Sequence, residues 1–276
     1  MSKRHELERR LHGLGEIRDI LSAMKNLAVM ETLKLARFLV DQKRVVTSME
    51  AAAADLLFFY PDLLPDAGES HDVCLLLGSE RGFCGDFNEA LLQALNAHRG
   101  CSQEAALVVV GSRLASRVAD DPRIAMRLDG PNVVEEVEAV LMRVMDALKG
   151  LRDPIRPLRL SVFHWQSLEE GVKVSTLRPF RPFKPTTNRY SHPPLLNTEP
   201  RVFLGELAAE YLFAVLHELF YGSLMAENQR RMQHMDHAVR GIEQDSTELL
   251  RKRNVLRQEE IIEEIEVIML SLEALS

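Results

Sequence analysis

All twelve prolines of this 276-residue chain fall between Pro61 and Pro200. The first sixty residues contain none, and neither do the last seventy-six. A proline inside a helix costs roughly 3 kcal/mol, so its absence permits long uninterrupted helices at both ends of the chain. Such helices would be several times longer than the usual helix of about 11–12 residues.

The C-terminal segment carries apolar side chains at alternating intervals of three and four residues, with Ser246 and Arg253 in the two polar slots. The apolar members of this seam are Met232, Met235, Val239, Ile242, Leu249 and Leu256. Such spacing is typical of a coiled coil. A helix over about residues 203–274 would be roughly 105–110 Å long, which is too long for a compact domain of this size to cover. A second apolar line follows at Ile261, Ile265, Ile268 and Leu272.

The N-terminal segment has the same apolar periodicity. Its stripe consists of Leu7, Leu11, Leu14, Ile17, Leu21, Met24 and Leu27. Residues 1–45 carry ten Lys/Arg against six Asp/Glu, whereas residues 201–276 carry eight against fourteen. Because opposite net charges favour close approach, we expect the terminal helices to pair as a long antiparallel coiled coil.

The middle of the chain has a different pattern, in which short apolar runs alternate with helical stretches. The strand candidates are residues 73–77, 106–110, 124–128, 158–165 and 172–177, and the helical stretches are about 88–98 and 133–148. This alternation predicts a small Rossmann-like α/β domain with a mainly parallel sheet. Residues 179–200 hold six prolines and read as a connecting loop. The expected domains are therefore a helix over 1–60, an inserted α/β domain over 70–200, and a helix over 201–276.

Composition excludes several classes of function. The net charge is −7 and the pI about 5.8, so no overall basic field points to nucleic acid. No apolar run reaches the ~18–20 residues that span a bilayer, so any membrane role is expected to be indirect. The three cysteines are an odd number, which argues against a disulfide framework and favours a reducing compartment.

The glycine-containing stretch 78–88 lies between a predicted strand and a predicted helix, where phosphate-binding loops occur. It lacks both the Gly-Lys-Ser/Thr and the Gly-x-Gly-x-x-Gly patterns, which favours a tight turn that needs glycine for positive φ. Cys84, within this stretch, has no neighbouring base and reads as structural. His234 and His237 lack further ligands for a metal. The sequence therefore predicts no catalytic, cofactor-binding or metal-binding residue.

Three segments together resemble the gamma subunit of F-type ATP synthases. Residues 17–25, Ile-Arg-Asp-Ile-Leu-Ser-Ala-Met-Lys, resemble the family's N-terminal helix. Residues 79–88, Ser-Glu-Arg-Gly-Phe-Cys-Gly-Asp-Phe-Asn, are similar to its Ser-Asp-Arg-Gly-Leu-Cys-Gly-Gly-Leu-Asn loop. Residues 227–268 resemble its C-terminal helix through Glu227, Arg231-Met232, Met235, Asn254, Arg257-Gln258, Ile261, Glu264 and Ile268. The chain looks like a divergent member, since Asp86 and Arg253 stand where the family has glycine and tyrosine.

The resemblance implies a central-stalk rotor that transmits torque between a membrane ring of c subunits and a hexamer of alpha and beta subunits, with epsilon as a further partner. It implies no catalysis by the chain itself, no cofactor, and a peripheral location on the cytoplasmic side of a bacterial inner membrane. Position matching marks Met24, Lys25, Arg257, Gln258 and Glu264 as contacts to the hexamer.

Two alternatives remain open from the residues alone. One is an enzyme built on the α/β domain that uses Cys84 or the glycine-containing stretch. The other is a coiled-coil scaffold unrelated to ATP synthesis.

Overall fold

The structure is a computed structural model that describes residues 3–63, 71–98, 105–151, 158–177 and 192–273. The chain divides into two compact units. Met1–Ala28 and Met232–Ser276 form one, called here the helix-pair unit, and Val29–Arg231 forms the other, called here the sheet unit. The two units are described separately.

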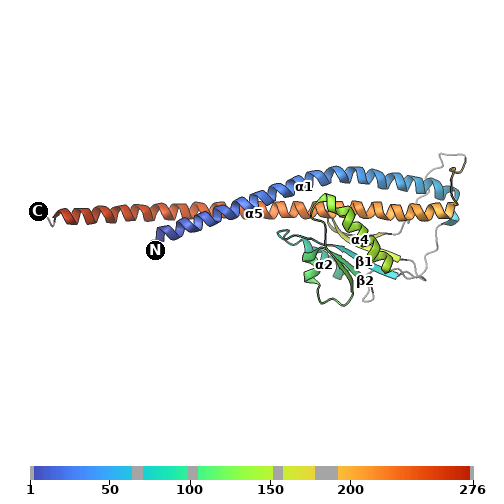
Figure 1. Ribbon diagram of the computed structural model, residues 1–276, viewed down its shortest axis with the longest axis horizontal. Helices are drawn as coiled ribbons and strands as arrows, with labels where there is room; N and C mark the ends of the chain where they lie inside the picture. The colour runs from blue at the N-terminus through green and yellow to red at the C-terminus, as the bar shows by residue number, and fades with distance from the viewer. Residues whose placement is uncertain (1–2, 64–70, 99–104, 152–157, 178–191, 274–276) are drawn as a thin grey trace. The chain divides into compact units, whose positions relative to one another are not determined.

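Two long helices lie at the ends of the chain, as the proline distribution predicts. Helix α1 spans Lys3–Phe59 and helix α5 spans Pro200–Glu273 (Figure 1). Pro200 occupies the first position of α5, where a backbone N–H would have no acceptor within the helix, so its absence costs nothing. None of the helices in the described ranges is long and apolar enough to cross a bilayer.

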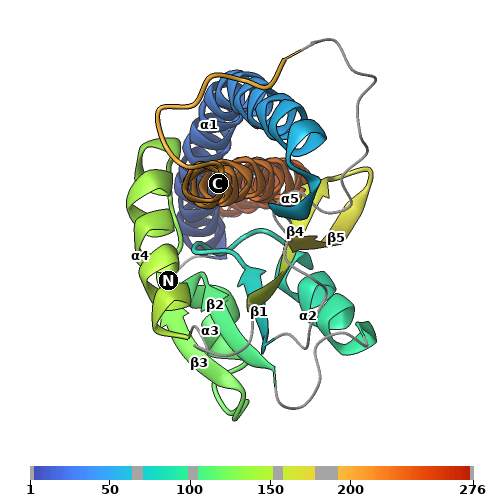
Figure 2. The ribbon, with the colours of Figure 1, turned by 90° about the vertical axis from the view of Figure 1, so that its right-hand side faces the viewer.

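The sheet unit contains a five-stranded sheet in the order β3-β2-β1-β4-β5 (Figure 2). Its strands are β1 His71–Leu77, β2 Ala106–Val110, β3 Ile124–Leu128, β4 Leu158–Ser167 and β5 Gly171–Leu177. All neighbouring strands are parallel except β4 and β5, which are antiparallel. The predicted strands and the mainly parallel sheet are thus confirmed.

Short helices complete the sheet unit. They are η1 Pro61–Leu63, α2 Phe87–Ala97, α3 Ser112–Arg117, η2 Val134–Glu136 and α4 Val137–Gly150. Alternate residues of each central strand enter two separate cores, as in a sheet that is covered on both faces. Val73 and Leu75 of β1 pack with α4 and with Leu216 of α5, whereas Cys74 and Leu76 pack with α2 and α3 (Figure 2).

Within the sheet unit, α1 and α5 contact each other in opposite chain order. The side-chain amide of Gln42 donates to the carbonyl oxygen of Ala214 at 2.8 Å, and the Tyr211 hydroxyl donates to Glu50 at 3.0 Å. Ala53, Leu56, Leu57 and Leu204 form an apolar cluster further along. These contacts fasten the first and last helices to each other beside the sheet.

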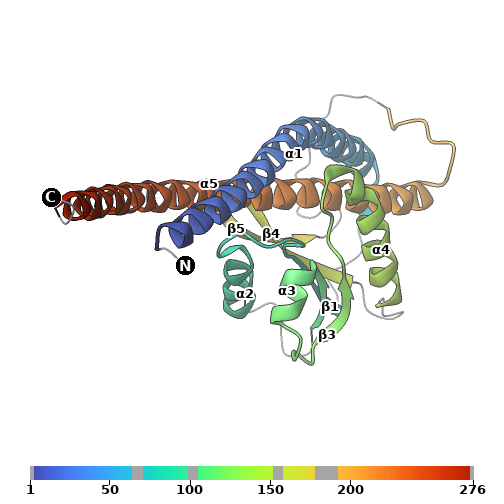
Figure 3. The ribbon, with the colours of Figure 1, turned by 60° about the vertical axis from the view of Figure 1, so that its left-hand side comes forward.

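Within the helix-pair unit, the beginning of α1 lies beside the later part of α5 (Figures 1 and 3). Arg4 pairs with Glu260 at 3.0 Å, and Lys25 pairs with Asp236 at 3.0 Å. Between α1 and α5, Leu21 packs against buried Met235 and Val239. The contacts again follow opposite chain order, so the two segments are antiparallel.

One expectation is confirmed, one needs correction and one is covered only in part. Gly85 has φ of 60°, so the stretch 78–88 contains a glycine with positive φ, as predicted. Gly78 does not adopt positive φ, but a Cβ there would lie 2.3 Å from the Cβ of Leu114. Cys74 is disulfide-bonded, against the expectation drawn from the odd cysteine count. Much of the expected proline-rich connection, residues 178–191, lies outside the described residues.

His164 on β4 gives a pH prediction for the sheet unit. Its side chain is buried, Nε2 lies 2.9 Å from the Ser175 hydroxyl, and Nδ1 has no hydrogen-bond partner within the described ranges. The pKa of His164 is lowered to about 4, chiefly by burial and to a smaller extent by the nearby Lys173 charge. The folded state therefore holds neutral imidazole, and it loses stability as pH falls from about 6.5 to about 4, by about 3 kcal/mol in all. His164→Gln keeps a hydrogen-bonding group at the Nε2 position, so urea unfolding across this range should show a shallower acid loss than in the parent.

Candidate functional site

The predicted seam of α5 lies on the inner side of the helix-pair unit. Met235 is fully buried, Val239 and Leu249 are 8% and 9% exposed, and Met232, Ile242 and Leu256 are half-buried. Met24 and Ala238 pack around the same cluster. Apolar burial of this kind holds two helices together without fixing a chemical site.

The five residues predicted to contact a hexamer divide into two groups. Met24 is half-buried against the seam, and Lys25 is engaged by Asp236, whose pKa is lowered chiefly by the hydrogen bond from Lys25. Arg257, Gln258 and Glu264 are exposed on α5. The second group is therefore accessible, whereas Met24 and Lys25 already contact the other helix.

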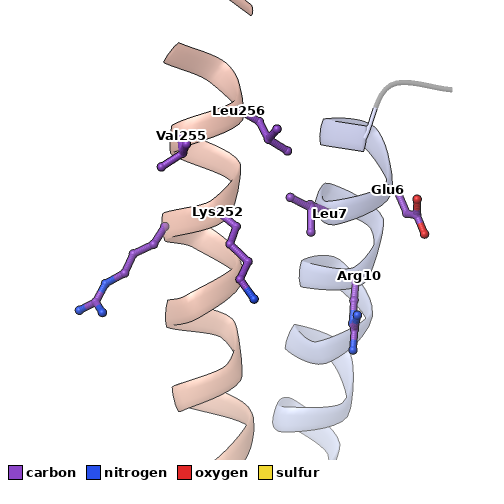
Figure 4. Close-up of a pocket in the computed structure, with 7 residues that line it drawn as sticks. Glu6, Leu7, Arg10, Lys252, Val255 and Leu256 are labelled. Atoms are coloured by element: carbon purple, nitrogen blue, oxygen red, sulfur yellow. The ribbon is translucent and has the colours of Figure 1, made fainter. Parts of the chain in front are cut away.

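A groove of about 610 Å³ lies between the two helices close to the start of α1 (Figure 4). Leu7 and Leu256 point toward each other across it (Figure 4). Three cations, Arg10, Arg251 and Lys252, line the same groove. The groove follows from incomplete packing of the two helices at this level, and it presents positive charge to whatever surrounds it.

The last turns of α5 are apolar on several sides and exposed. Because Arg4 in the first described turn of α1 pairs with Glu260, the residues that follow Glu260 run past the start of α1 (Figures 1 and 3). The exposed apolar side chains there are Ile261, Ile262, Ile265, Val267, Ile268, Met269 and Leu270. Ile261, Ile265 and Ile268 belong to the predicted apolar line, whereas Ile262, Val267, Met269 and Leu270 lie outside it. An apolar surface of this extent is typical of a binding site.

The glycine-containing stretch after β1 is hydrogen-bonded to other parts of the same chain through Glu80. The carboxylate of Glu80 accepts hydrogen bonds from Ser112 N at 2.9 Å, Ser112 Oγ at 2.5 Å and Gly130 N at 2.7 Å. Burial raises the pKa of Glu80, but these hydrogen bonds outweigh burial and lower the pKa below its ordinary value. Glu80 thus joins the stretch after β1 to the first residue of α3 and to Gly130.

Helix α5 covers the other place where a doubly wound sheet binds ligands. That place lies at the carboxyl ends of β1 and β4, where the strand order reverses. The Ser223 hydroxyl donates to the Leu77 carbonyl at 3.4 Å, and the Arg230 guanidinium lies 5.0 Å from the Trp165 ring centre. The usual ligand-binding edge of the sheet is therefore occupied by packing against the C-terminal helix of the same chain.

The chemical groups weighed in the sequence are poorly placed for catalysis. Burial raises the pKa of the Cys84 thiol, which donates to the Ser79 hydroxyl at 3.3 Å; a neutral thiol is a weak nucleophile. His234 and His237 are exposed on α5. Across the described ranges, no three His, Cys, Asp or Glu side chains are grouped to hold a metal ion.

Sequence reasoning missed a buried charged cluster on α5. Glu227 and Arg231 form an ion pair with only 5% and 6% of their side chains exposed, and Asn228 lies beside them. Glu227 and Arg231 stood out in the sequence only as positions of resemblance. The available signal was a Glu and an Arg four residues apart, a spacing that places them on one face of a helix but does not reveal burial.

Phe83 at the tip of the stretch gives a second prediction. Its φ is 61° and its side chain is 56% exposed. A non-glycine residue in this region costs roughly 1–2 kcal/mol, and an exposed ring regains little of that. Phe83→Gly is therefore expected to stabilise the sheet unit by about 1 kcal/mol, whereas Phe83→Ala, which keeps the strain, should change stability little. Equal urea midpoints for the two variants would count against a strained loop.

The chain is similar to a known protein family over nearly its whole length. Residues 3–275 match the family described as ATP synthase. A relative named ATP synthase gamma chain, from Clostridium botulinum, is 23% identical and aligns over 97% of this chain and 96% of its own length.

Solved ATP synthase structures contain chains of the same fold. The Euglena gracilis mitochondrial ATP synthase in rotational state 3 matches 99% of this chain and 94% of its own with a TM-score of 0.60 at 14% identity. The Tetrahymena thermophila mitochondrial ATP synthase central stalk matches 79% of this chain and 99% of its own with a TM-score of 0.54 at 17% identity. Because the family match covers nearly the whole chain, the chain belongs to the ATP synthase gamma-subunit family.

Proposed function

We propose that this chain is the central-stalk rotor subunit of an F-type ATP synthase. The observation that carries the proposal is the family match over residues 3–275. In this role, the c-ring turns the chain, and the chain turns inside a hexamer of alpha and beta subunits. Each orientation of an asymmetric shaft contacts the catalytic subunits differently, and only such differential contact shifts their conformational populations.

The role needs a stiff shaft, and the terminal helices fit that need. We propose that residues 1–60 and 201–276 form an antiparallel coiled coil whose seam runs through Met232, Met235, Val239, Ile242, Leu249 and Leu256, with a Rossmann-like domain over 70–200 inserted between them. Two contacts support this arrangement, the burial of Met235 and Val239 against Leu21 and the Lys25–Asp236 ion pair. Two helices that are joined by both apolar packing and ion pairs resist being twisted apart.

The proposed hexamer contacts are on the helix-pair unit. Arg257 and Gln258 are exposed donors that suit carboxylates on beta-subunit loops, and Glu264 follows two turns later. Met24 and Lys25 would contribute only through the parts of their side chains that α5 leaves exposed. The exposed apolar end of α5 suits a collar of apolar side chains, because an apolar helix end is stable only when covered. The sheet unit would face epsilon and the c-ring, and the complex would bind the cytoplasmic side of a bacterial inner membrane.

The proposed subunit is non-catalytic. The carboxyl ends of β1 and β4, where an α/β domain would hold a nucleotide, are covered by α5. The neutral Cys84 thiol offers no activated nucleophile. The energy of ATP would then enter through the surrounding subunits, and this chain would supply shape and stiffness.

Reconstitution with the alpha and beta subunits of the same organism tests the proposal. The chain is expected to join the complex as a single copy and to show no nucleotide hydrolysis alone. Arg257→Ala together with Gln258→Ala should slow hydrolysis by the complex and leave the stability of the isolated chain within about 0.5 kcal/mol, since both are surface positions. Arg37→Ala, an exposed arginine on the sheet-unit part of α1, is the matched control. Robust hydrolysis by the pure chain, or its exclusion from the complex, would overturn the proposal.

A further inference from the structure

A buried polar joint connects the loop after β1 to helix α5 within the sheet unit. Arg231 Nε donates to the carbonyl oxygen of Gly82 at 3.2 Å. The backbone N–H of Arg81 hydrogen-bonds to the Glu227 carboxylate. Two successive residues of the loop are therefore held through their backbone, one by each member of the Glu227–Arg231 pair.

On α5, the polar side chains of the joint also hydrogen-bond to one another and to the helix backbone. Arg231 Nη1 donates to Asn228 Oδ1 at 2.8 Å, Arg231 Nη2 donates to Glu227, and Asn228 Nδ2 donates to the carbonyl oxygen of Leu224 at 3.0 Å. Burial raises the pKa of Glu227 to about 7 against the opposing effect of Arg231. A buried ion pair recovers its desolvation cost only in part, and apolar side chains of the same size often stabilise a fold as well. Stability alone is therefore a weak reason for these residues.

The loop is also fixed to the sheet, so the joint reaches the domain itself. Ser79 N donates to Asn88 Oδ1 at 3.0 Å, and Asn88 Nδ2 donates to Ser79 Oγ at 2.8 Å. Glu80 is held by Ser112 and Gly130. A force on α5 at Arg231 is thereby passed to β1, α2 and α3 without crossing a loose segment.

The direction of these bonds distinguishes them from the apolar contacts nearby. Leu216, Phe220 and Leu224 of α5 pack against the sheet core, but apolar contacts are non-directional and permit a helix to turn in its groove by small steps. Charge-assisted hydrogen bonds are short and directional. The Arg231 guanidinium stands roughly 5 Å or more from the helix axis, so its bond to Gly82 opposes rotation of α5 about that axis.

We infer that Glu227 and Arg231 lock the rotation of helix α5 to that of the α/β domain, and so act as positioning residues for torque transfer. The inference rests on the proposed rotor function. Arg231 is the last residue of the sheet unit along α5, so the lock stands where torque from the domain leaves this unit along the helix. Without it, α5 is held to the domain by apolar contacts, by the long Ser223–Leu77 hydrogen bond at 3.4 Å and by the partly exposed Arg230–Asp86 pair at 3.5 Å. Part of each turn of the domain is then lost as rotation of α5 against the sheet.

The test uses the whole complex in vesicles and compares two rates, ATP hydrolysis and the membrane potential that hydrolysis builds, followed with a potential-sensitive dye. The double variant Glu227→Leu with Arg231→Met replaces the pair by apolar packing. We expect hydrolysis to persist and the potential built per ATP to fall several-fold. The matched control is Asp72→Leu with Arg159→Met, which removes an ion pair between the second residues of β1 and β4. This control should leave the ratio unchanged.

Rescue separates a torque lock from a merely structural pair. Asp86 and Arg230 already contact each other across the same loop and helix at 3.5 Å. Cysteines are placed at these two positions in the parent chain and in the double variant, and a short bismaleimide joins them. The cross-link should restore the ratio in the double variant and leave the ratio of the parent unchanged. An unaltered ratio in the double variant, or a fall that the cross-link does not reverse, would overturn the inference.

Two further outcomes are distinguishable. Should the double variant fail to assemble, the ratio is measured with Arg231→Lys, which keeps the charge and loses the planar fork; a normal ratio there overturns the inference. If the unsubstituted chain does not enter the complex at all, the proposed function fails instead.

Discussion

Replacing Met235 with aspartate is expected to separate the paired ends of α1 and α5 and to reduce ATP synthesis by the complex to background. Met235 is fully buried in a cluster with Leu21 and Val239. Loss of a buried methionine costs about 2–5 kcal/mol, and burying an unpaired carboxylate adds several kcal/mol. The helix-pair unit has one such cluster in its described part, so no second core compensates for the loss.

A zero-length carbodiimide cross-link provides a direct readout of this separation. The Lys25 ammonium lies 3.0 Å from the Asp236 carboxylate, so activation of Asp236 should join the two helices by an amide in the parent chain. Mass spectrometry of the digested chain should detect this link in the parent and not in Met235→Asp. Met235→Asp should also show a weaker helical signal by circular dichroism than the parent.

Two other positions on α5 grade the same effect. Ile242 is half-buried beside the cluster, so Ile242→Asp should weaken the cross-link less than Met235→Asp does. Ile262 is 55% exposed, and Ile262→Asp should leave the cross-link and the unfolding midpoint unchanged in the isolated chain. A parent-like cross-link yield in Met235→Asp would show that the seam does not hold these helices together.

The regular elements of this chain were accessible from its sequence because each depends on local composition. The proline-free ends gave α1 and α5 to within a few residues, since nothing interrupts their hydrogen-bonding ladders. The run at 106–110 is β-branched or apolar at every position and ends in glycine, and it forms β2 over those residues. Covered parallel strands are recognisable in sequence for this reason.

The features that fill the sheet's ligand-binding edge were not accessible, because they depend on residues far apart in the chain. Gly78 owes its identity to Leu114, and Gly82 meets Arg231 only when α5 returns to the sheet. The sequence predicted a glycine with positive φ in this stretch, and Gly85 has it, but the positive φ of Phe83 was not predicted. Contacts to partner subunits are harder still to predict from the sequence. The exposure of Arg257 and Gln258 is known only after the seam, which buries the opposite side of α5, has been located.

Gly111→Ala is expected to destabilise the sheet unit by about 3–5 kcal/mol, through positive φ and overlap together. Gly111 has φ of 103°, and a Cβ there would lie 2.6 Å from the carbonyl oxygen of Gly78 and 2.7 Å from that of Ser79. The backbone cannot move aside, because Gly111 N donates to the Leu128 carbonyl at 2.9 Å and Gly78 N donates to the Val110 carbonyl at 2.9 Å. Domains are stable by about 5–15 kcal/mol, so the loss would remove a large share of the total.

Two other glycines separate the contributions to this loss in urea unfolding. Gly171 has φ of 76° with nothing within 4 Å of an added Cβ, so Gly171→Ala should cost only the backbone strain of roughly 1–2 kcal/mol. Gly150, at the end of α4, has neither positive φ nor a neighbour within 4 Å, and Gly150→Ala should stabilise the helix by up to about 1 kcal/mol. The difference between the stability losses of Gly111→Ala and Gly171→Ala measures the cost of the overlap between the added Cβ and the carbonyl oxygens of Gly78 and Ser79. Equal losses at the two positions would mean that the turn after β2 relaxes away from β1, and the edge of the sheet that Glu80 and α5 fill would then be looser than its hydrogen bonds indicate.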